Sequence, residues 1–190
     1  MITENLTNQF LVATPRLTNT EFGQSVILMC QDNNEGAMGL VINKPVKQTL
    51  KKVFKTLKID YGHTSSQIIN HPIHIGGPLK PDNIFVLHTL TDEAYDTTIK
   101  INDDIAVTLS SDILHDIADN RPPKAFMVVA GYASWAPEQL VDEIKENDWL
   151  SAEFNEVLLF SSADQNKWRD CLASIGISSP ARLSHQYGHA

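Results

Sequence analysis

A serine in the segment Gly131-Tyr-Ala-Ser-Trp135 is the first residue in this chain that could do chemistry. Ser134 follows an apolar run and precedes a predicted helix, and hydrolases place a nucleophilic serine at such a strand-to-helix turn. The tight turn of those enzymes needs a glycine two residues after the serine, where this chain has Ala136. The sequence therefore favours turn or capping chemistry at Ser134 over a nucleophile.

Histidines at His71 and His74, with His88 downstream, have a spacing that could seat a metal ion. Two histidines alone make a weak signal, and Pro72 between them excludes a helix across the pair. The chain carries neither an HExxH nor a CxxC motif. We therefore expect no metal site and no cofactor.

The run Gly76-Gly77-Pro78 could let backbone amides approach a phosphate. It lacks both GxGxxG and the Lys-Ser/Thr ending of a P-loop, so a tight turn is the favoured interpretation. A ligand-binding protein or a hydrolase-like enzyme remains the alternative. Its cleft would be lined by Gly76, Gly77, His88, Gly131 and Ser134.

The two cysteines, Cys30 and Cys171, each lie within an apolar pattern. Both are predicted to be buried and unpaired, and two cysteines are too few for a disulfide scaffold. No apolar run approaches the ~18–20 residues of a membrane span, and the first residues lack the basic and apolar regions of a secretory signal. We expect a cytoplasmic protein with no membrane contact.

Positive charge is concentrated in one stretch of the chain. Between Lys44 and Lys58 there are six lysines and no acid, whereas the other 175 residues hold nine basic groups (15 − 6) and all 23 acids. Apolar residues at positions 50, 53, 54 and 57 predict a helix there, with lysines on its opposite face. The candidate partner-binding patch comprises Lys47, Lys51, Lys52, Lys55 and Lys58.

The lysine stretch has three possible interpretations: a solvated helix face, a site for an acidic protein, or a site for nucleic acid. The segment Pro81–Asn120 carries nine acids and one lysine, which opposes phosphate-driven binding. We therefore expect the partner to be another protein with an acidic surface. Nucleic acid is the less favoured partner. The oligomeric state is left open.

Hydrophobic periodicity and turn residues predict many strands joined by hairpins, with helices inserted irregularly, which is an α+β pattern. One hairpin is expected at the turn residues Asp32–Gly36 and a second at Asn102–Asp104. The two strands of the first hairpin are nearly all apolar, so both of their faces are expected to be covered. The predicted strands are Phe10–Thr14, Ser25–Gln31, Met38–Asn43, Ile73–Ile75, Ile84–His88, Thr97–Ile101, Ile105–Ser110, Ala125–Ala130 and Val157–Phe160. No linker or repeat divides the chain, so one domain over residues 1–190 is predicted, with a flexible tail from about residue 178.

Capping signals locate the predicted helices. Besides the lysine helix, one is expected over Ser111–Ala118 with a serine cap. Another has Ala136 as its cap, with a hydrophobic staple from Trp135 to Leu140. The last begins at a capping box formed by Ser162 and Gln165. The polar segment Tyr61–His71 is predicted to be a loop.

Several segments, taken in order along nearly the whole chain, resemble the AlgH/YqgE family of bacterial proteins. They are Phe10-Leu-Val-Ala-Thr-Pro15, Gly36-Ala-Met-Gly-Leu-Val-Ile-Asn-Lys-Pro45, Gly76-Gly-Pro-Leu79 with Phe85-Val-Leu-His88, and Gly131-Tyr-Ala-Ser-Trp135 followed by Gln139-Leu140 and Trp149-Leu150. The closing Gly188-His-Ala190 is also similar to that family's ending.

The resemblance implies a single α+β domain whose bent, bifurcated and largely antiparallel sheet approaches a barrel, flanked by short helices. It implies no activity and no catalytic or binding residues, only a label of transcriptional regulator. Members often have Gly at the position of Ser134, and Arg-Gly where this chain has Asn83-Ile84. They also often have Gly in place of Glu138, so a function that needed these glycines is in doubt here.

No helix-turn-helix signature is present, and a pI near 5.2 is unusual for a protein that binds duplex DNA alone. The prediction is a non-enzymatic cytosolic bacterial protein that acts through macromolecular contacts, with a transcription-related role resting on the family label. The alternatives are nucleic-acid binding through Lys44–Lys58 and the ligand cleft described above.

Overall fold

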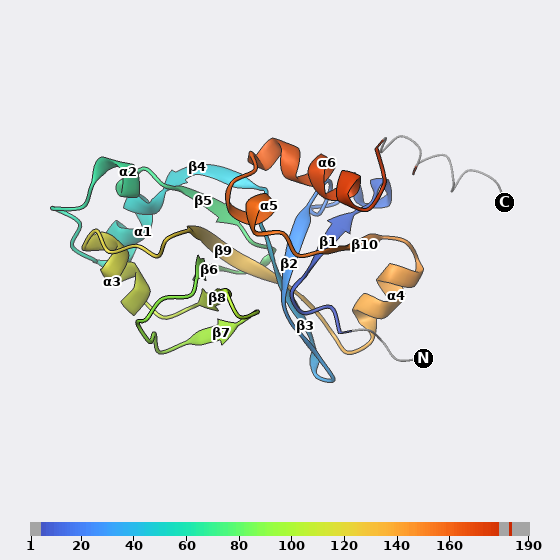
Figure 1. The fold of residues 1–190 in the computed structure, drawn as a ribbon, viewed down its shortest axis with the longest axis horizontal. Coiled ribbons are helices and arrows are strands. Elements are labelled where there is room, and N and C mark those ends of the chain that lie inside the picture. The colour runs from blue at the N-terminus through green and yellow to red at the C-terminus, as the bar shows by residue number, and fades with distance from the viewer. Residues whose placement is uncertain (1–4, 179–182, 184–190) are drawn as a thin grey trace.

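The computed structural model describes residues 5–178 and residue 183 (Figure 1). The tail predicted to be flexible from about residue 178 therefore lies almost wholly outside the described residues. The strands are β1 (Gln9–Ala13), β2 (Val26–Asn33), β3 (Gly36–Val41), β4 (Pro45–Thr49), β5 (Pro72–Ile75), β6 (Leu79–Thr89), β7 (Thr98–Lys100), β8 (Ile105–Thr108), β9 (Phe126–Trp135) and β10 (Trp149–Glu153). The helices are η1 (Pro15–Leu17), α1 (Leu50–Leu57), α2 (Ser66–Ile69), α3 (Asp112–Ala118), α4 (Gln139–Lys145), α5 (Glu156–Phe160) and α6 (Asp164–Ser174).

The strands form one bent sheet that forks at β9. The main order is β10-β1-β2-β3-β9-β6-β8-β7, and β4 and β5 form a branch. One edge of β9 pairs with β6, while the other pairs with β5 through Val128–Ala130 and then with β3 through Ala133–Trp135. Only the β5–β9 pairing is parallel among the described strand pairs. The predicted α+β fold with a bifurcated, largely antiparallel sheet is confirmed.

Three glycines fill the fork between β3, β5 and β9. A Cβ on Gly76 would lie 2.3 Å from the Gly131 carbonyl oxygen, and one on Gly77 would lie 2.2 Å from the carbonyl carbon of Tyr132. Gly131 has φ +74°, a conformation that other residues rarely adopt. Gly76 also accepts a hydrogen bond from the Val41 N–H and donates one to the Ala130 carbonyl. These glycines let three backbones approach closely where the sheet divides.

Helices cover both faces of the sheet, so the alternating side chains of the central strands are buried on both sides. Phe10 and Leu28 pack with residues of α5 and α6, whereas Leu11 and Ile27 pack in a cluster beneath α4. The branch of β4 and β5 is covered differently. There α1 and α3 pack on Val128 and Ile73. The predicted burial of both faces of the first hairpin is confirmed.

Most elements agree with the sequence prediction. The helix at Leu50–Leu57 forms as the periodicity predicts, with Leu50, Val53 and Phe54 buried, although Leu57 is 44% exposed. The two predicted hairpins are present as the antiparallel pairs β2–β3 and β7–β8. Gly176 follows α6 with φ +84°, as expected for the residue that ends a helix.

The prediction was wrong about the chain between β9 and α6. Residues 156–160 form a helix and not a strand, because the Asn155 side chain caps the Leu158 N–H at 3.0 Å. The neighbouring strand β10 was not predicted. The predicted Ser162 cap is absent: α6 begins after Ala163, which has no side-chain cap. A short apolar run does not distinguish a helix from a strand, so the cap and the sheet register decide.

Helix starts elsewhere also differ by a few residues. Helix α4 begins at Gln139, after Glu138 with φ +67°, although Gln139 Oε1 still accepts from the Ala136 N–H at 2.9 Å. The predicted cap at Ser111 makes no side-chain hydrogen bond. The predicted loop at 61–71 contains α2, which Ser65 caps. None of the helices in the described ranges combines the length and apolar character of a membrane span.

Candidate functional site

A pocket of about 250 Å³ lies where η1, the end of β9, α4 and the start of β10 meet. Its apolar lining consists of Leu17, Phe22, Pro78, Leu79, Trp135 and Trp149. Its polar lining consists of Thr20, Ser134, Gln139, Glu143 and Asp148. Sites for drug-sized ligands are larger, roughly 300–1,000 Å³, so this pocket suits a single side chain or a very small molecule.

Three neutral N–H groups hold the carboxylate of Glu143 at this pocket. The indole Nε1 atoms of Trp135 and Trp149 both donate to Oε2 at 2.8 Å, and Gln139 Nε2 donates to Oε1 at 2.9 Å. The two indoles pack edge to face with ring centroids 6.0 Å apart. These three hydrogen bonds fix the orientation of the Glu143 carboxylate.

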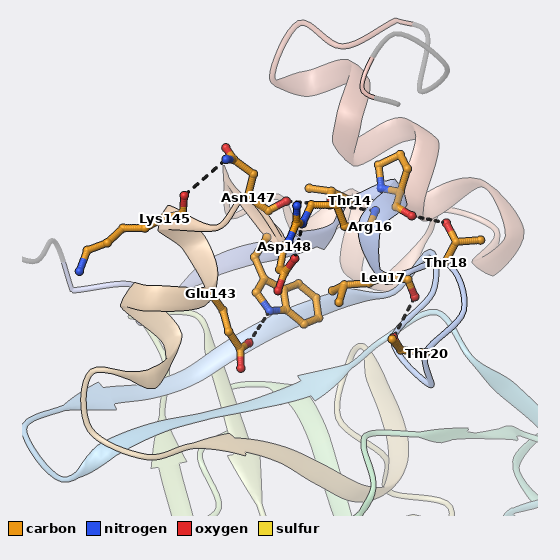
Figure 2. Close-up of polar contacts among 11 residues, drawn as sticks. Thr14, Arg16, Leu17, Thr18, Thr20, Glu143, Lys145, Asn147 and Asp148 are labelled. Atoms are coloured by element: carbon orange, nitrogen blue, oxygen red, sulfur yellow. Dashed lines mark hydrogen bonds and ion pairs between the residues drawn. The ribbon is translucent and has the colours of Figure 1, made fainter. Parts of the chain in front are cut away.

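Hydrogen bonds tie the turn around η1 to the turn between α4 and β10 (Figure 2). The Thr14 hydroxyl donates to the Asn147 carbonyl at 2.8 Å, and the Thr14 N–H donates to the Asp148 carbonyl at 3.0 Å. Arg16 Nε donates to Asp148 Oδ1 at 2.8 Å. Asp148 therefore has a cation beside it, whereas no cation pairs with Glu143 anywhere in the described chain.

Ser134 is exposed and lies inside β9, not at a strand-to-helix turn as the sequence suggested. It lines the pocket, but no histidine does so. A nucleophilic serine needs an adjacent base to take its proton. In the described chain the Ser134 side chain has no hydrogen bond to Glu143 or to a histidine, so it lacks the adjacent base of a nucleophilic serine.

The other residues of the predicted cleft lie in two different places. Gly76, Gly77 and Gly131 meet at the fork of the sheet, close to the pocket through Pro78 and Ser134. His88 is buried and pairs with Phe126 at the far end of β9. The structure thus brings the glycines together with one another but not with His88.

His88 is a satisfied core histidine. Its Nδ1 donates to the Thr89 carbonyl at 2.9 Å, so that in the neutral ring Nε2 accepts from the Thr108 hydroxyl at 2.9 Å. Burial lowers the pKa of His88, and the Thr89 carbonyl only partly opposes that change. Both ring nitrogens have protein partners, which leaves neither free for a substrate or a metal.

The lysine stretch forms a ridge that runs from the edge strand β4 along the solvent side of α1. We call Lys47, Lys51, Lys52, Lys55 and Lys58 the lysine ridge. All five are exposed, and in the described chain none of them has a hydrogen-bond or ion-pair partner for its side chain. By contrast, Lys145 and Lys167 each pair with an aspartate at 2.9 Å. The ridge is a set of uncompensated positive charges.

A buried charged cluster, which sequence reasoning missed, links α6 to β5 and to the end of β3. Lys167 is 2% exposed, and its Nζ donates to Asp164 Oδ1 at 2.9 Å and to the Ile42 carbonyl at 3.0 Å. His74 Nε2 donates to Asp164 Oδ2 at 3.0 Å. The signal in the sequence was a lysine four residues before Cys171, which is on the apolar face of the helix.

The same cluster shifts the pKa values of its members. Burial alone would raise the pKa of the Asp164 carboxyl, but the hydrogen bonds from His74 and Lys167 outweigh it and lower the pKa. Burial lowers the pKa of Lys167, and Asp164 only partly opposes this. His74 Nδ1 is buried and has no partner in the described chain. The cluster links α6 to the sheet. None of its residues lines the pocket described above.

The remaining chemical candidates are the two cysteines and His71. Both cysteines are buried and free, as predicted, and burial raises the pKa of Cys30 and of Cys171 to about 12. His71 stacks on Phe126 with ring centroids 4.3 Å apart. In the described ranges, no group of three or more His, Cys, Asp or Glu residues is placed to hold a metal ion.

The chain is an α+β protein with a forked half-barrel sheet. Its surface carries the lysine ridge and the small pocket described above, which we call the acidic-aromatic pocket because Glu143 and Asp148 line it together with Phe22, Trp135 and Trp149. A family model described as AlgH-like matches residues 10–180, and the chain belongs to this family. A UPF0301 protein of Francisella tularensis subsp. mediasiatica is 42% identical over 175 residues, covering 91% of this chain and 90% of the relative. A UPF0301 protein of Francisella philomiragia is 40% identical with the same coverage of this chain.

Solved structures show the same fold. The solution structure of the AlgH protein from Pseudomonas aeruginosa matches with a TM-score of 0.79 and 31% identity, covering 100% of this chain and 98% of that protein. The crystal structure of protein DIP2367 from Corynebacterium diphtheriae matches with a TM-score of 0.69 and 18% identity, over 94% of this chain and 97% of that protein. The second likeness concerns the fold alone.

Proposed function

We propose that this protein acts through contact with another macromolecule and not as an enzyme, and that its lysine ridge binds an acidic surface of a partner protein in the cytoplasm. The observation that carries the proposal is the ridge itself. Five exposed ammonium groups lie on one side of a short helix and its preceding strand, and none is neutralised within the described chain. Unpaired charge of one sign steers association with the opposite sign.

An acidic protein is favoured over nucleic acid because acids lie near the ridge. Helix α3, which carries Asp112 and Asp116 and is followed by Asp119, lies at the same end of the molecule as α1 (Figure 1). A long duplex laid on the ridge would bring its phosphates towards these carboxylates. A compact acidic partner avoids that repulsion. A role in transcription, as the family label suggests, would then come through a protein contact and not through DNA.

Charge reversal on the ridge tests the proposal. Lys51→Glu, Lys52→Glu and Lys55→Glu combined should leave the fold nearly intact, since all three side chains are exposed and each change costs within about 0.5 kcal/mol. In affinity capture from lysate of a host bacterium, followed by mass spectrometry, the wild-type protein should retain an acidic protein. Capture should weaken steeply between low and high salt and be lost in the triple variant.

The matched control is the combination Lys80→Glu, Lys100→Glu and Lys124→Glu, which changes the net charge equally at exposed sites outside the ridge. This control should retain the partner. Equal loss in both triple variants would show a general charge effect, and unchanged capture after ridge reversal would make the lysines an ordinary solvated face. Tight, salt-sensitive binding of purified protein to duplex DNA, abolished only by ridge reversal, would favour the nucleic-acid alternative instead.

A further inference from the structure

We propose that the pocket between η1, β9, α4 and β10 is a receptor for an arginine side chain presented by a polypeptide. The pocket and the lysine ridge belong to α4 and α1, which lie at opposite ends of the molecule (Figure 1). The inference is therefore independent of the function proposed above. It rests on the size of the pocket, its charge and its aromatic lining.

The charge of the pocket lining favours a cationic ligand. Two carboxylates line the pocket and no lysine, arginine or histidine does. Asp148 is paired with Arg16, but the charge of Glu143 meets only neutral donors among the described residues. The segment around it adds further acids, since residues 138–148 contain five acids and one lysine. A cationic group is the charge class that complements this pocket.

The Glu143 carboxylate can accept one more hydrogen bond. A carboxylate has about four acceptor positions, and three N–H groups occupy three of them. One position on Oε1 is left for a ligand. The two indoles and Gln139 fix the orientation of the carboxylate beforehand, so that binding a cation requires little reordering of this group.

The aromatic and aliphatic residues of the lining favour arginine over other cations. Trp135, Trp149 and Phe22 line the pocket together with Leu17 and Leu79. Aromatic rings attract cations, and a guanidinium is planar, stacks on rings and is less strongly hydrated than an ammonium. The aliphatic stem of arginine would contact the leucines. A volume of about 250 Å³ is small enough to favour one side chain over a larger ligand.

Nuclear magnetic resonance tests the proposal with the blocked tripeptide acetyl-Gly-Arg-Gly-amide as the probe. The indole N–H signals of Trp135 and Trp149 should shift on titration. The signal of Trp168 should stay in place, because its Nε1 donates to the Ala13 carbonyl and it does not line the pocket. The same tripeptide with citrulline, which has the shape of arginine without its charge, should bind at least about tenfold more weakly.

Two variants localise the site. Ser134→Trp places a large side chain at an exposed position of the lining and should weaken binding at least about tenfold, while Ser151→Trp, an exposed strand position outside this pocket, should not. Glu143→Gln should weaken the arginine probe about as much as citrulline does. Its folding is checked by the urea midpoint, and if that variant is unfolded Ser134→Trp carries the test alone.

Each other outcome counts against the proposal. Equal binding of the arginine and citrulline tripeptides would overturn the role of charge, and shifts at Trp168 alone would place the site elsewhere. Absence of any shift at 20-fold molar excess over a millimolar protein sample would overturn the site. Tighter binding of free arginine than of the tripeptide would keep the guanidinium chemistry but overturn a polypeptide as its source.

Discussion

Removing the counter-charge of the buried lysine should destabilise this protein strongly although it leaves the apolar core untouched. In Asp164→Ala the ammonium of Lys167, 2% exposed, would keep only the Ile42 carbonyl as its acceptor. Breaking a buried ion pair from one side costs about 3–5 kcal/mol, because it leaves an uncompensated charge. The Asp164 side chain is 24% exposed, so water can reach part of the gap and the low end, about 3 kcal/mol, is expected.

The double variant Asp164→Ala with Lys167→Met separates charge from packing. It removes both ionic groups, so no buried lysine charge remains unpaired. The residual cost comes from two groups that lose their partners, the Ile42 carbonyl and the His74 Nε2 N–H, at about 1 kcal/mol each, and the second of these costs is shared with Asp164→Ala alone. The double variant should therefore be more stable than Asp164→Ala alone. This inversion, in which a second deletion restores stability, is specific to an unpaired buried charge.

Urea unfolding followed by circular dichroism measures these differences. With a slope of about 2 kcal/mol/M, a loss of 3 kcal/mol lowers the midpoint by about 1.5 M. A midpoint shift of Asp164→Ala below about 0.5 M, or a double variant less stable than the single one, would refute the reasoning. Lys167→Met alone should cost less than Asp164→Ala, because Asp164 keeps its contact with His74 and is partly hydrated.

The contact between Asp164 and Lys167 should also make the free energy of unfolding depend on pH, in a direction that follows from the pKa shift of Asp164. The pKa of Asp164 is lowered in the folded protein, so in the pH range between its folded and unfolded values the unfolded state binds more protons. The stabilisation by this group is fully present above the unfolded pKa of about 4 and is lost as the pH falls through the lower folded value. The urea midpoint of the wild type should fall more steeply below about pH 4.5 than that of Asp164→Ala.

Two further predictions concern the aromatic and thiol groups of the core. Trp135→Ala should cost about 3–5 kcal/mol, since Trp135 is 5% exposed and also donates to Glu143, and a cost under about 1 kcal/mol by urea unfolding would contradict its place in the core. Cys30 and Cys171 should not react with Ellman's reagent in the native protein but should both react in urea, because burial raises both pKa values to about 12. Fast labelling of either thiol under native conditions would contradict the buried position.

Local sequence patterns predicted an element correctly where the residues that determine its structure lie within the element itself. The helix at Leu50–Leu57 was predictable because its apolar residues recur with the helical period and its lysines fall opposite them. The β2–β3 hairpin was predictable because Asp32 to Gly36 supplies turn residues between two apolar runs. The exposure of the lysine ridge follows from the same periodicity.

Local patterns failed where the deciding partner lies far away in the chain. The apolar run at 157–160 is compatible with either a strand or a helix, and the Asn155 cap together with the strand register of β10 on β1 selected the helix. The boundary of α4 moved for a similar reason. There β9 continues through Trp135 in register with Ala37 of β3, which delays the start of the helix.

For the residues that could do chemistry, too, the sequence predicted local features but not which distant residues meet. The sequence predicted a tight turn at Gly76 and Gly77 and named Gly131 only as part of a possible cleft. The forked sheet shows that the three glycines serve the close approach of β3, β5 and β9. Their place in a ligand cleft stays a prediction, and His88 lies apart from them. The acidic-aromatic pocket joins Leu17, Ser134 and Trp149, which no spacing rule connects.

The sequence by itself determined the α+β class, the doubly covered strands, the buried thiols and a helix with one lysine face, because each depends on periodicity and composition within a short segment. The tertiary structure alone decided which distant groups meet. Long-range strand pairing places the indole groups of β9 and β10 on the same carboxylate, and the packing of α6 buries Lys167 beside Asp164 and His74. Such contacts depend on the path of the whole chain, and neighbouring residues do not encode them.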